Sequence, residues 1–290
     1  MKNLVNLFKF FLCYNIMEKA TSKEKKESER KKIGLALGAG GTLGYTHVGV
    51  LKVLEKHKIP IDYIAGSSIG SLMGAHYALY KSADKTEKAA LDFVKDEGLR
   101  IYDLSTVTSR KTKEKKIKLY LEELFGSYGV ENTKIPFISV TVDLGSGEEF
   151  LVDRGRLVDA VMGSITAGVF TPVFFWGRWL VDGGFLNPTP LNVARDMGAD
   201  FVIGVDLTKR IHKSINETPG WWFSLNKSMD ITIRKLDELR SNEVRNKIVV
   251  FPDFKDTNEA ATVKKAKEFI EAGETATERL IPKIKKMMKE

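Results

Sequence analysis

The pentapeptide Gly66-Ser67-Ser68-Ile69-Gly70 most constrains how this 290-residue chain can fold. It follows the apolar run from Ile61 to Ala65, which predicts a short strand. A strand that passes through a G-x-S-x-G turn into a helix forms a nucleophile elbow, because the glycines allow a bend tight enough to present the serine hydroxyl at the edge of a sheet. Ser68 is therefore the candidate nucleophile, with Gly66 and Gly70 as the glycines of its turn.

A glycine-rich loop lies upstream of the elbow. The run from Ile33 to Leu37 predicts a buried strand, which leads through Gly38-Ala39-Gly40-Gly41-Thr42-Leu43-Gly44 into a predicted helix that ends near Lys58. A glycine loop at a helix N-terminus gathers backbone N–H groups, which bind negative charge. We expect an oxyanion hole for acyl transfer, made by Gly38, Gly40, Gly41 and Thr42.

A dinucleotide-binding loop is the alternative interpretation of these glycines. That motif requires G-x-G-x-x-G and an acidic residue about 20 positions later. Here Leu43 stands where the third glycine belongs, and the next predicted strand ends in the serine elbow. The oxyanion hole is the favoured interpretation.

A third segment, Asp182-Gly183-Gly184, follows an apolar run that predicts a strand over Trp179 to Val181. An isolated D-G-G sequence is most simply a tight turn in which the aspartate caps the backbone. Together with Ser68, it also supplies a carboxylate that can act as a general base.

These segments, in this order and at this spacing, resemble the patatin-like phospholipase family. The resemblance covers nearly all of residues 33–207. It is carried by Leu35-Ala36-Leu37-Gly38-Ala39-Gly40-Gly41 with Gly44, His47-Val48-Gly49-Val50-Leu51, Gly66-Ser67-Ser68-Ile69-Gly70-Ser71-Leu72, Gly168-Val169-Phe170-Thr171-Pro172-Val173, Val181-Asp182-Gly183-Gly184 and Asn187-Pro188-x-Pro190.

The resemblance implies a three-layer α/β/α fold with a largely parallel sheet, and a Ser–Asp dyad in which Ser68 is the nucleophile and Asp182 the base. It also implies that the loop around Gly40 and Gly41 is the oxyanion hole. Two positions depart from the family pattern: Leu43 replaces the usual Arg or Lys, and Ala167 replaces a common proline.

A Ser-Asp-His triad is the alternative to the dyad, because α/β-hydrolases place a histidine after the aspartate. The chain has four histidines. His47 shares an apolar helix face, His57 lies among lysines at a helix end, and His76 is eight residues beyond Ser68 on the same predicted helix, roughly 12 Å along its axis. Only His212 fits the triad order.

The predicted chemistry is covalent catalysis, in which Ser68 attacks an ester carbonyl and water activated by Asp182 releases the acid. We expect no cofactor and no metal, since the sequence offers no cluster of ligand residues.

Strand-like runs separated by helical stretches predict one α/β domain over 33–290, with a C-terminal helical extension. The predicted strands are Ile33–Leu37, Tyr63–Gly66, Phe137–Val142, Glu149–Val152, Trp179–Val181, Phe201–Asp206 and Ile248–Phe251. A final helix is expected over Val263–Met288.

Another helix is expected to follow Trp221, Trp222 and Phe223, and to pack through Met229, Ile233, Leu236 and Leu239. The tryptophan pair suits either the core or a lid or interface near an acyl groove.

Residues 1–17 predict an amphipathic, membrane-associating helix, because Lys2, Asn6, Lys9 and Cys13 project onto one stripe of an otherwise apolar helix. A signal-like segment is the alternative; Lys9 and the lack of a small-x-small cleavage site disfavour it. A disordered tail is the third possibility.

Residues 18–32 predict a solvated linker, since eleven of the fifteen are charged, seven basic and four acidic. The formal net charge of +8 lies largely in the tails and in 110–118, and no nucleic-acid-binding motif accompanies it. We therefore expect anionic lipid headgroups, and not nucleic acid, as the partner.

The sequence thus predicts a serine hydrolase that cleaves acyl esters of phospholipids or lysophospholipids, located in the cytoplasm and peripheral on a membrane. The single cysteine gives no reason to expect an oxidising compartment. Two rival functions are a small-ester esterase that uses His212 in a triad, and a non-catalytic lipid-binding scaffold.

Overall fold

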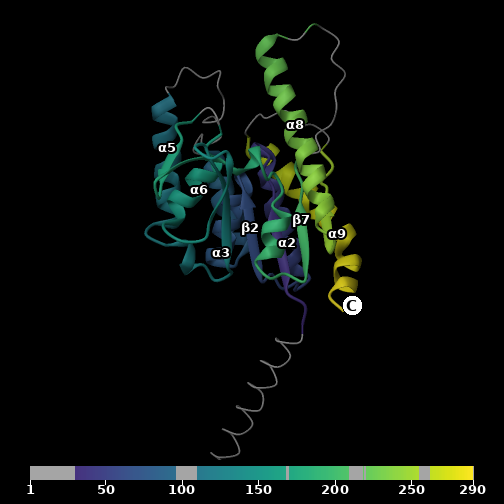
Figure 1. Cartoon of the computed structure of the whole chain (residues 1–290). Helices are drawn as coiled ribbons and strands as arrows, with labels where there is room; N and C mark the ends of the chain where they lie inside the picture. Colours follow the sequence, from purple (N-terminus) through teal and green to yellow (C-terminus); the bar gives the residue numbers. More distant parts are fainter. Residues whose placement is uncertain are drawn as a thin grey trace, which may run out of the picture.

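The computed structural model describes residues 30–95, 110–167, 170–208, 218, 220–254 and 262–289 (Figure 1). The predicted N-terminal helix over 1–17 lies outside the described residues, as do His212 and the side chain of Trp222. Most of the predicted linker also lies outside them, but Arg30, Lys31 and Lys32 are described.

The described residues form a three-layer α/β/α fold around one mixed sheet. Its strands are β1 (Ile33–Leu37), β2 (Tyr63–Ser67), β3 (Phe137–Asp143), β4 (Glu148–Val152), β5 (Val173–Phe175), β6 (Arg178–Asp182), β7 (Phe201–Val205) and β8 (Lys247–Val250). The main order is β5-β6-β3-β2-β1-β7-β8, and β4 pairs with β3. Strands β3, β2, β1, β7 and β8 run parallel, whereas β4 and β6 run antiparallel to β3. This confirms the predicted fold class.

Strand alternation divides the core between the two faces of the sheet. In β1, Ile33, Leu35 and Leu37 join the larger core, whereas Ala36 joins the smaller core on the other face. This is the period-two pattern of a strand buried on both sides.

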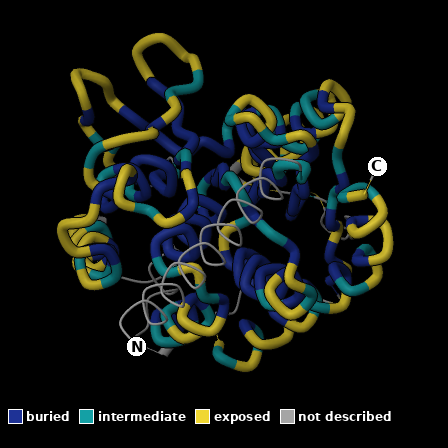
Figure 2. The backbone as a smooth tube through the Cα atoms, turned by 90° about the horizontal axis from the view of Figure 1, so that it is seen from below, coloured by how far each residue is buried: buried dark blue, intermediate teal, exposed yellow. Residues whose placement is uncertain are grey.

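Helices cover both faces of the sheet (Figures 1 and 2). The larger core takes side chains from α2 (Tyr45–Lys56), α3 (Ile69–Tyr80), α4 (Ala83–Lys95), α5 (Arg110–Phe125), α6 (Leu157–Ile165) and α9 (Val263–Met287). The smaller core is formed largely with α7 (Leu191–Asp196), and α8 (Trp221–Glu243) packs on α7. Short 3₁₀ turns lie at η1 (Gly41–Gly44), η3 (Val130–Asn132) and η4 (Gly183–Phe185).

The C-terminal helix α9 belongs to the domain, because it packs along α2 and buries Phe269, Ile270 and Ile284 in the larger core. Leu280 of the same helix is only partly buried there.

Two features differ from the sequence predictions. Strand β5 was not predicted, because its three residues stand between Pro172 and the Trp176-Gly177 turn and form too short a run to read as a strand. Helix α8 is present, but Met229 and Leu239 are 41% and 56% exposed, so the prediction that this helix packs through them is wrong.

The parallel strands set the direction of the site. The described chain enters β1 from the bottom of Figure 1, so the carboxyl ends of β1 and β2 lie at the upper edge of the sheet. The glycine loop and Ser68 follow these two ends directly. Ligands of open α/β sheets bind outside this edge.

Candidate active site

Ser68 is the single residue between β2 and α3, and it has a strained backbone. Its dihedral angles are φ 54° and ψ −126°, in a region that side-chain-bearing residues rarely adopt. Such strain is retained where the surrounding structure fixes it, and it is typical of functional turns. The conformation directs the hydroxyl away from the buried strand and toward the cavity, which Ser68 lines.

The two glycines of the elbow are required because backbone approaches them closely. A Cβ atom on Gly66 would lie 2.6 Å from the Cα of Ser71, and one on Gly70 would overlap the carbonyl oxygen of Leu37. Both contacts involve backbone, which cannot rotate away as a side chain can. The same two residues therefore seat α3 tightly against the ends of β1 and β2.

A second serine fixes the elbow. The Ser68 amide donates to Ser164 Oγ at 2.9 Å, and Ser164 Oγ donates to the carbonyl oxygen of Val140 at 2.6 Å. Ser164 lies on α6 and is fully buried. Sequence reasoning missed it, because no motif marks a helical serine whose partner comes from 96 positions away.

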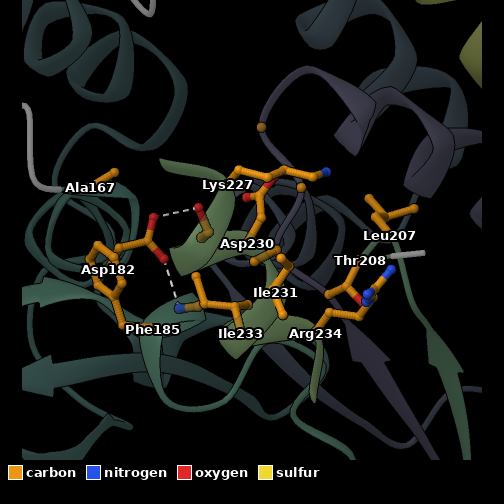
Figure 3. A pocket seen from close by; sticks show the side chains of 15 residues that line it. Ala167, Asp182, Phe185, Leu207, Thr208, Lys227, Asp230, Ile231, Ile233 and Arg234 are labelled. Atoms are coloured by element: carbon orange, nitrogen blue, oxygen red, sulfur yellow. Dashed lines mark hydrogen bonds between the residues drawn. The ribbon is translucent and has the colours of Figure 1, made fainter. Parts of the chain in front are cut away.

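Asp182 ends β6 and contacts Ser68 directly (Figure 3). Ser68 Oγ donates to Asp182 Oδ2 at 2.6 Å, and the amide of Gly184 donates to Oδ1 at 2.7 Å. The amide of Asp182 donates to Thr166 O at 3.0 Å. One carboxylate oxygen is thus oriented by the backbone, and the other faces the serine hydroxyl.

Burial changes the acidity of this carboxyl group. Asp182 is only 7% exposed. Loss of solvation raises its pKa to about 6, although the hydrogen bonds from Ser68 and Gly184 oppose the shift. A carboxylate with a pKa near neutrality is a better base at physiological pH than an exposed aspartate.

The two glycines after Asp182 allow close contact with the strands and the loop. A Cβ on Gly183 would overlap the carbonyl oxygen of Val140, and one on Gly184 would lie 2.8 Å from the Cβ of Ala39. The Asp182-Gly183-Gly184 turn therefore packs directly beneath the glycine loop.

The glycine loop presents only part of the predicted oxyanion hole to the cavity. The amide of Gly38 donates to Val205 O at 3.1 Å, so it is occupied in holding the loop to β7. Thr42 is buried and does not line the cavity. Gly40 and Gly41 do line it, and no hydrogen bond among the described residues uses their amides. Gly41 has φ +57°, which turns the chain at this point.

His47 supports the loop from below. Its Nε2 lies 2.8 Å from the carbonyl oxygen of Gly38, which only accepts, so Nε2 carries the proton. The ring is fully buried, and desolvation lowers its pKa to about 4 despite the hydrogen bond to Gly38. His47 is therefore neutral at physiological pH and has the buried structural role that the sequence favoured.

These groups line a cavity of about 190 Å³. Helix α8 forms one wall of it with Lys227, Asp230, Ile231, Ile233 and Arg234 (Figure 3). Phe185, Leu207 and Ala167 add apolar surface beside Ser68 and Asp182. The sequence did not indicate the contribution of α8, because residues so far along the chain reach the cavity only through the tertiary fold.

The model of the patatin-like phospholipase family matches residues 35–195. The chain belongs to this family. The match spans the glycine loop, the elbow and the Asp182 turn, which confirms the family resemblance.

Several curated relatives share this region with the patatin-like chain. It is 31% identical over 200 residues to Patatin-like phospholipase domain-containing protein 6 of Mus musculus, covering 66% of this chain and 15% of that protein. It is 34% identical over 181 residues to an uncharacterised NTE family protein of Mycobacterium tuberculosis, covering 62% of this chain and 50% of the relative. Lysophospholipase NTE1 of Scheffersomyces stipitis is 30% identical over 183 residues, covering 60% of this chain and 12% of that protein. The chain thus spans half or less of the length of these relatives.

A solved structure shares the fold of the patatin-like chain. VipD from Legionella pneumophila superposes with a TM-score of 0.50 at 13% identity, covering 87% of this chain and 67% of that one.

The described histidines of this patatin-like chain do not line the cavity. His57 Nε2 pairs with Glu278 Oε2 at 2.8 Å, and His76 Nδ1 lies 3.0 Å from Thr86 Oγ1. Among the described residues, no histidine lines the cavity and no three His, Cys, Asp or Glu side chains gather as a metal site would require. His212 is outside the described residues, so its place in a triad stays a prediction.

Leu43 takes no part in the cavity. It is 2% exposed and packs in the larger core, so the position at which the family usually carries a cation is apolar and internal here. The cations that do line the cavity come from α8.

Proposed function

We propose that this protein hydrolyses acyl esters of phospholipids or lysophospholipids through an acyl-enzyme on Ser68. The observation that carries the proposal is the 2.6 Å hydrogen bond from Ser68 Oγ to Asp182 Oδ2, in a cavity that Gly40 and Gly41 also line. A nucleophile, a base and unoccupied amide donors are the three parts that acyl transfer needs.

In the first half of the proposed reaction, Ser68 Oγ attacks the ester carbonyl carbon as its proton passes to Asp182 Oδ2. The carbonyl oxygen becomes an oxyanion, which the amides of Gly40 and Gly41 stabilise. The bond to the leaving alcohol then breaks, the alcohol oxygen takes the proton from Asp182, and the acyl group stays on Ser68.

In the second half, water attacks the acyl carbonyl carbon and gives a proton to Asp182 Oδ2. The new tetrahedral intermediate is held by the same amides. It collapses when the bond to Ser68 Oγ breaks and Asp182 returns the proton to that oxygen, which releases the fatty acid and restores the dyad. No cofactor takes part in the proposed reaction.

Chemistry of the cavity wall supports a phospholipid class of substrate. Phe185, Leu207 and Ile233 offer apolar contacts for an acyl chain, and Lys227 and Arg234 place two cations at the same wall. A phosphate-bearing headgroup matches this combination. The name of the Scheffersomyces stipitis relative, a lysophospholipase, agrees with this class.

Active-site labelling followed by lipid hydrolysis tests the proposal. We expect a fluorophosphonate probe to label the purified protein at Ser68, and the protein to release fatty acid from phosphatidylcholine or lysophosphatidylcholine. Ser68→Ala should abolish both. A folded protein that is neither labelled nor active on any acyl ester would favour the non-catalytic scaffold.

The headgroup contribution is tested separately. Lys227→Gln should raise KM for a lysophospholipid about tenfold or more and change turnover of a neutral monoacylglycerol little, because one charged hydrogen bond contributes about 1.5–3 kcal/mol and 1.4 kcal/mol is about tenfold. Equal effects on both substrates would exclude phosphate recognition by Lys227.

We also propose a cytoplasmic protein that is peripheral on membranes. No helix among the described residues combines the length and apolar character needed to cross a bilayer.

A further inference from the structure

The two halves of α8 differ in how they are attached to the domain. In the C-terminal half, the buried carboxylate of Asp237 accepts hydrogen bonds from the amide of Thr189 at 2.8 Å and from Thr189 Oγ1 at 3.1 Å. Arg240 forms an ion pair with Glu149. The first contact holds the C-terminal half on the Asn187–Pro190 segment, which follows the active-site turn, and the second holds it on β4.

The N-terminal half of α8 projects beyond the domain at the top of Figure 1. Between Trp221 and Leu236, no described side chain is buried. Five large apolar side chains are at least 41% exposed in this half: Trp221 at 77%, Phe223 at 50%, Leu225 at 49%, Met229 at 41% and Ile231 at 50%.

These apolar residues surround the helix instead of forming a single stripe. At 100° per residue, Trp221 and Leu225 fall on one side, Phe223 on the opposite side and Ile231 between them. Polar residues, among them Asn226, Lys227 and Asp230, stand between them in the sequence. Several large apolar side chains exposed close together on one helix indicate an interaction surface, whereas scattered single exposed residues do not.

A cationic surface on the same side of the molecule lies at the start of α5. The N-terminal ends of α5 and α8 both point toward the top of Figure 1, the side at which the active site opens. From Lys111 to Lys118, α5 has five lysines and one glutamate, and four of these lysines are exposed: Lys111, Lys115, Lys116 and Lys118. Apolar and basic side chains together match a bilayer with anionic headgroups.

The cavity at Ser68 adjoins the exposed apolar residues of α8. At about 190 Å³ it is smaller than the roughly 300–1,000 Å³ of pockets that enclose a drug-sized ligand. It can hold the reacting ester and a few carbons, and a second cavity of about 880 Å³ shares Thr208, Ile231 and Arg234 with it. Ile231 contributes both to the cavity wall and to the exposed apolar set, which makes the two surfaces continuous.

We propose that the exposed apolar residues of α8 and the exposed lysines of α5 form a docking face that seats the active site on an anionic bilayer. The inference rests on the proposed lipid hydrolase function and names the surface through which the substrate arrives. In this arrangement the α8 side chains enter the acyl region, and the α5 lysines lie among the headgroups.

A matched pair of substitutions on α8 tests the apolar part. Leu225 and Leu239 are 49% and 56% exposed and lie two heptads apart on nearly the same side of the helix, separated by roughly 21 Å along the axis. In the full chain, Leu225→Ser should weaken binding to vesicles of phosphatidylcholine and phosphatidylglycerol by about tenfold or more, because several buried methylenes are lost. Leu239→Ser should bind as the unmodified chain does.

A second pair tests the charge. Lys111→Glu should weaken binding to the same vesicles about tenfold at low salt and much less at high salt, since each basic residue near the surface contributes about 1 kcal/mol that salt screens. Lys58→Glu makes the same charge change at the end of α2, on the opposite edge of the sheet, and should have little effect.

Two readouts keep this inference separate from the proposed chemistry. Vesicle binding is measured with Ser68→Ala in every variant, so it does not depend on turnover. Hydrolysis of a soluble short-chain p-nitrophenyl ester is measured with Ser68 intact, and Leu225→Ser should leave it unchanged while reducing hydrolysis of vesicle lipid. Absence of hydrolysis in all proteins would refute the chemistry and leave the binding result valid.

The docking face is refuted if Leu225→Ser and Leu239→Ser bind vesicles equally well. It is also refuted if the unmodified chain sediments as a dimer without lipid and Leu225→Ser converts it to a monomer, because the apolar residues of α8 then cover a second copy of the chain.

Discussion

Ser68 Oγ and Asp182 Oδ2 lie 2.6 Å apart although 114 positions separate them in the chain. The contact is direct, and no described imidazole lines the cavity around it. It forms because β2 and β6 both flank β3, and their registers place Ser67 opposite Val140 and Asp182 opposite the next residue, Thr141.

Substitution of the two adjacent serines should separate the nucleophile from its neighbour. Ser68→Ala should lower ester hydrolysis by several orders of magnitude, as loss of a nucleophile does in serine hydrolases. Ser67 is fully buried, and its hydroxyl has no hydrogen-bond partner among the described residues, so Ser67→Ala should retain a substantial part of the activity. Steady-state kinetics with circular dichroism checks both; equal losses would indicate a folding defect.

Removal of the base should cost at least about 100-fold in kcat, the scale of general-base assistance. Asp182→Asn is the variant for this test, because it keeps the size of the side chain while removing its charge. His212→Ala should stay within a few-fold of the unmodified enzyme. The reverse result would replace the dyad by a triad.

Activity should depend on pH through Asp182. Because burial raises its pKa to about 6, the carboxylate is charged and able to act as a base only above that value, and kcat/KM should be half-maximal near pH 6 and level off above it. A pH–rate profile with a soluble ester checks this. An acid limb near pH 4 would mean that the carboxyl group is solvated.

The same shift has a consequence for stability. A carboxyl group with a raised pKa stabilises the fold below its ordinary pKa of 3.8, and this contribution, about 3 kcal/mol, is lost as pH rises through about 6. Asp182→Asn should therefore gain stability relative to the unmodified protein between pH 4 and 7 in urea unfolding.

His47 should make the fold sensitive to acid in the opposite sense. Because burial lowers its pKa to about 4, the neutral ring stabilises the fold above about pH 6.5, and this contribution, about 3 kcal/mol, is lost as pH falls from 6.5 toward 4. In urea unfolding, the stability of His47→Gln should fall less steeply than that of the unmodified protein as pH falls from 6.5 to 4. The remaining loss should come from buried His76, whose pKa is also lowered to about 4.

Truncation should separate location from chemistry. The cut belongs after residue 29, because Arg30 and the amide of Lys32 are held by the domain through Asp62 and Asp200. The shortened chain should hydrolyse a soluble ester at a nearly unchanged rate. Its binding to anionic vesicles should fall if the predicted N-terminal helix associates with membranes. Unchanged binding at low and high salt would leave the docking face of α8 and α5 as the main contact.

The candidate dyad could be predicted because glycines stand close to both of its residues in the sequence. Gly66, Gly70, Gly183 and Gly184 stand where backbone or neighbouring atoms leave no room for a Cβ, so their spacing in the sequence reports the turns that carry Ser68 and Asp182. The buried strands were equally readable, since both faces of β1 and β7 are covered and their sequences are continuously apolar.

The residues that support the elbow or enclose the cavity could not be predicted in this way. Ser164 acts only because α6 places it behind the elbow, and the cavity wall from α8 depends on how that helix crosses the sheet. The exposure of α8 could not be predicted either, because apolar residues at helical spacing give the same sequence pattern whether they face a core or project from the domain. Among these features, only the Trp221-Trp222-Phe223 run gave a signal.

The bidentate contact of Arg30 with Asp62, at 2.6 Å and 2.5 Å, secures the start of β1 at the edge of the sheet opposite Ser68. Any tether formed by the residues before Arg30 would therefore hold the domain from its far end. The part of the predicted 18–32 linker that precedes Arg30 has twelve residues, which reach at most about 40 Å when extended, comparable to the thickness of a small domain. A domain attached in this way can rotate so that the edge of the sheet with Ser68 faces the lipid, while the tether keeps the protein at the membrane.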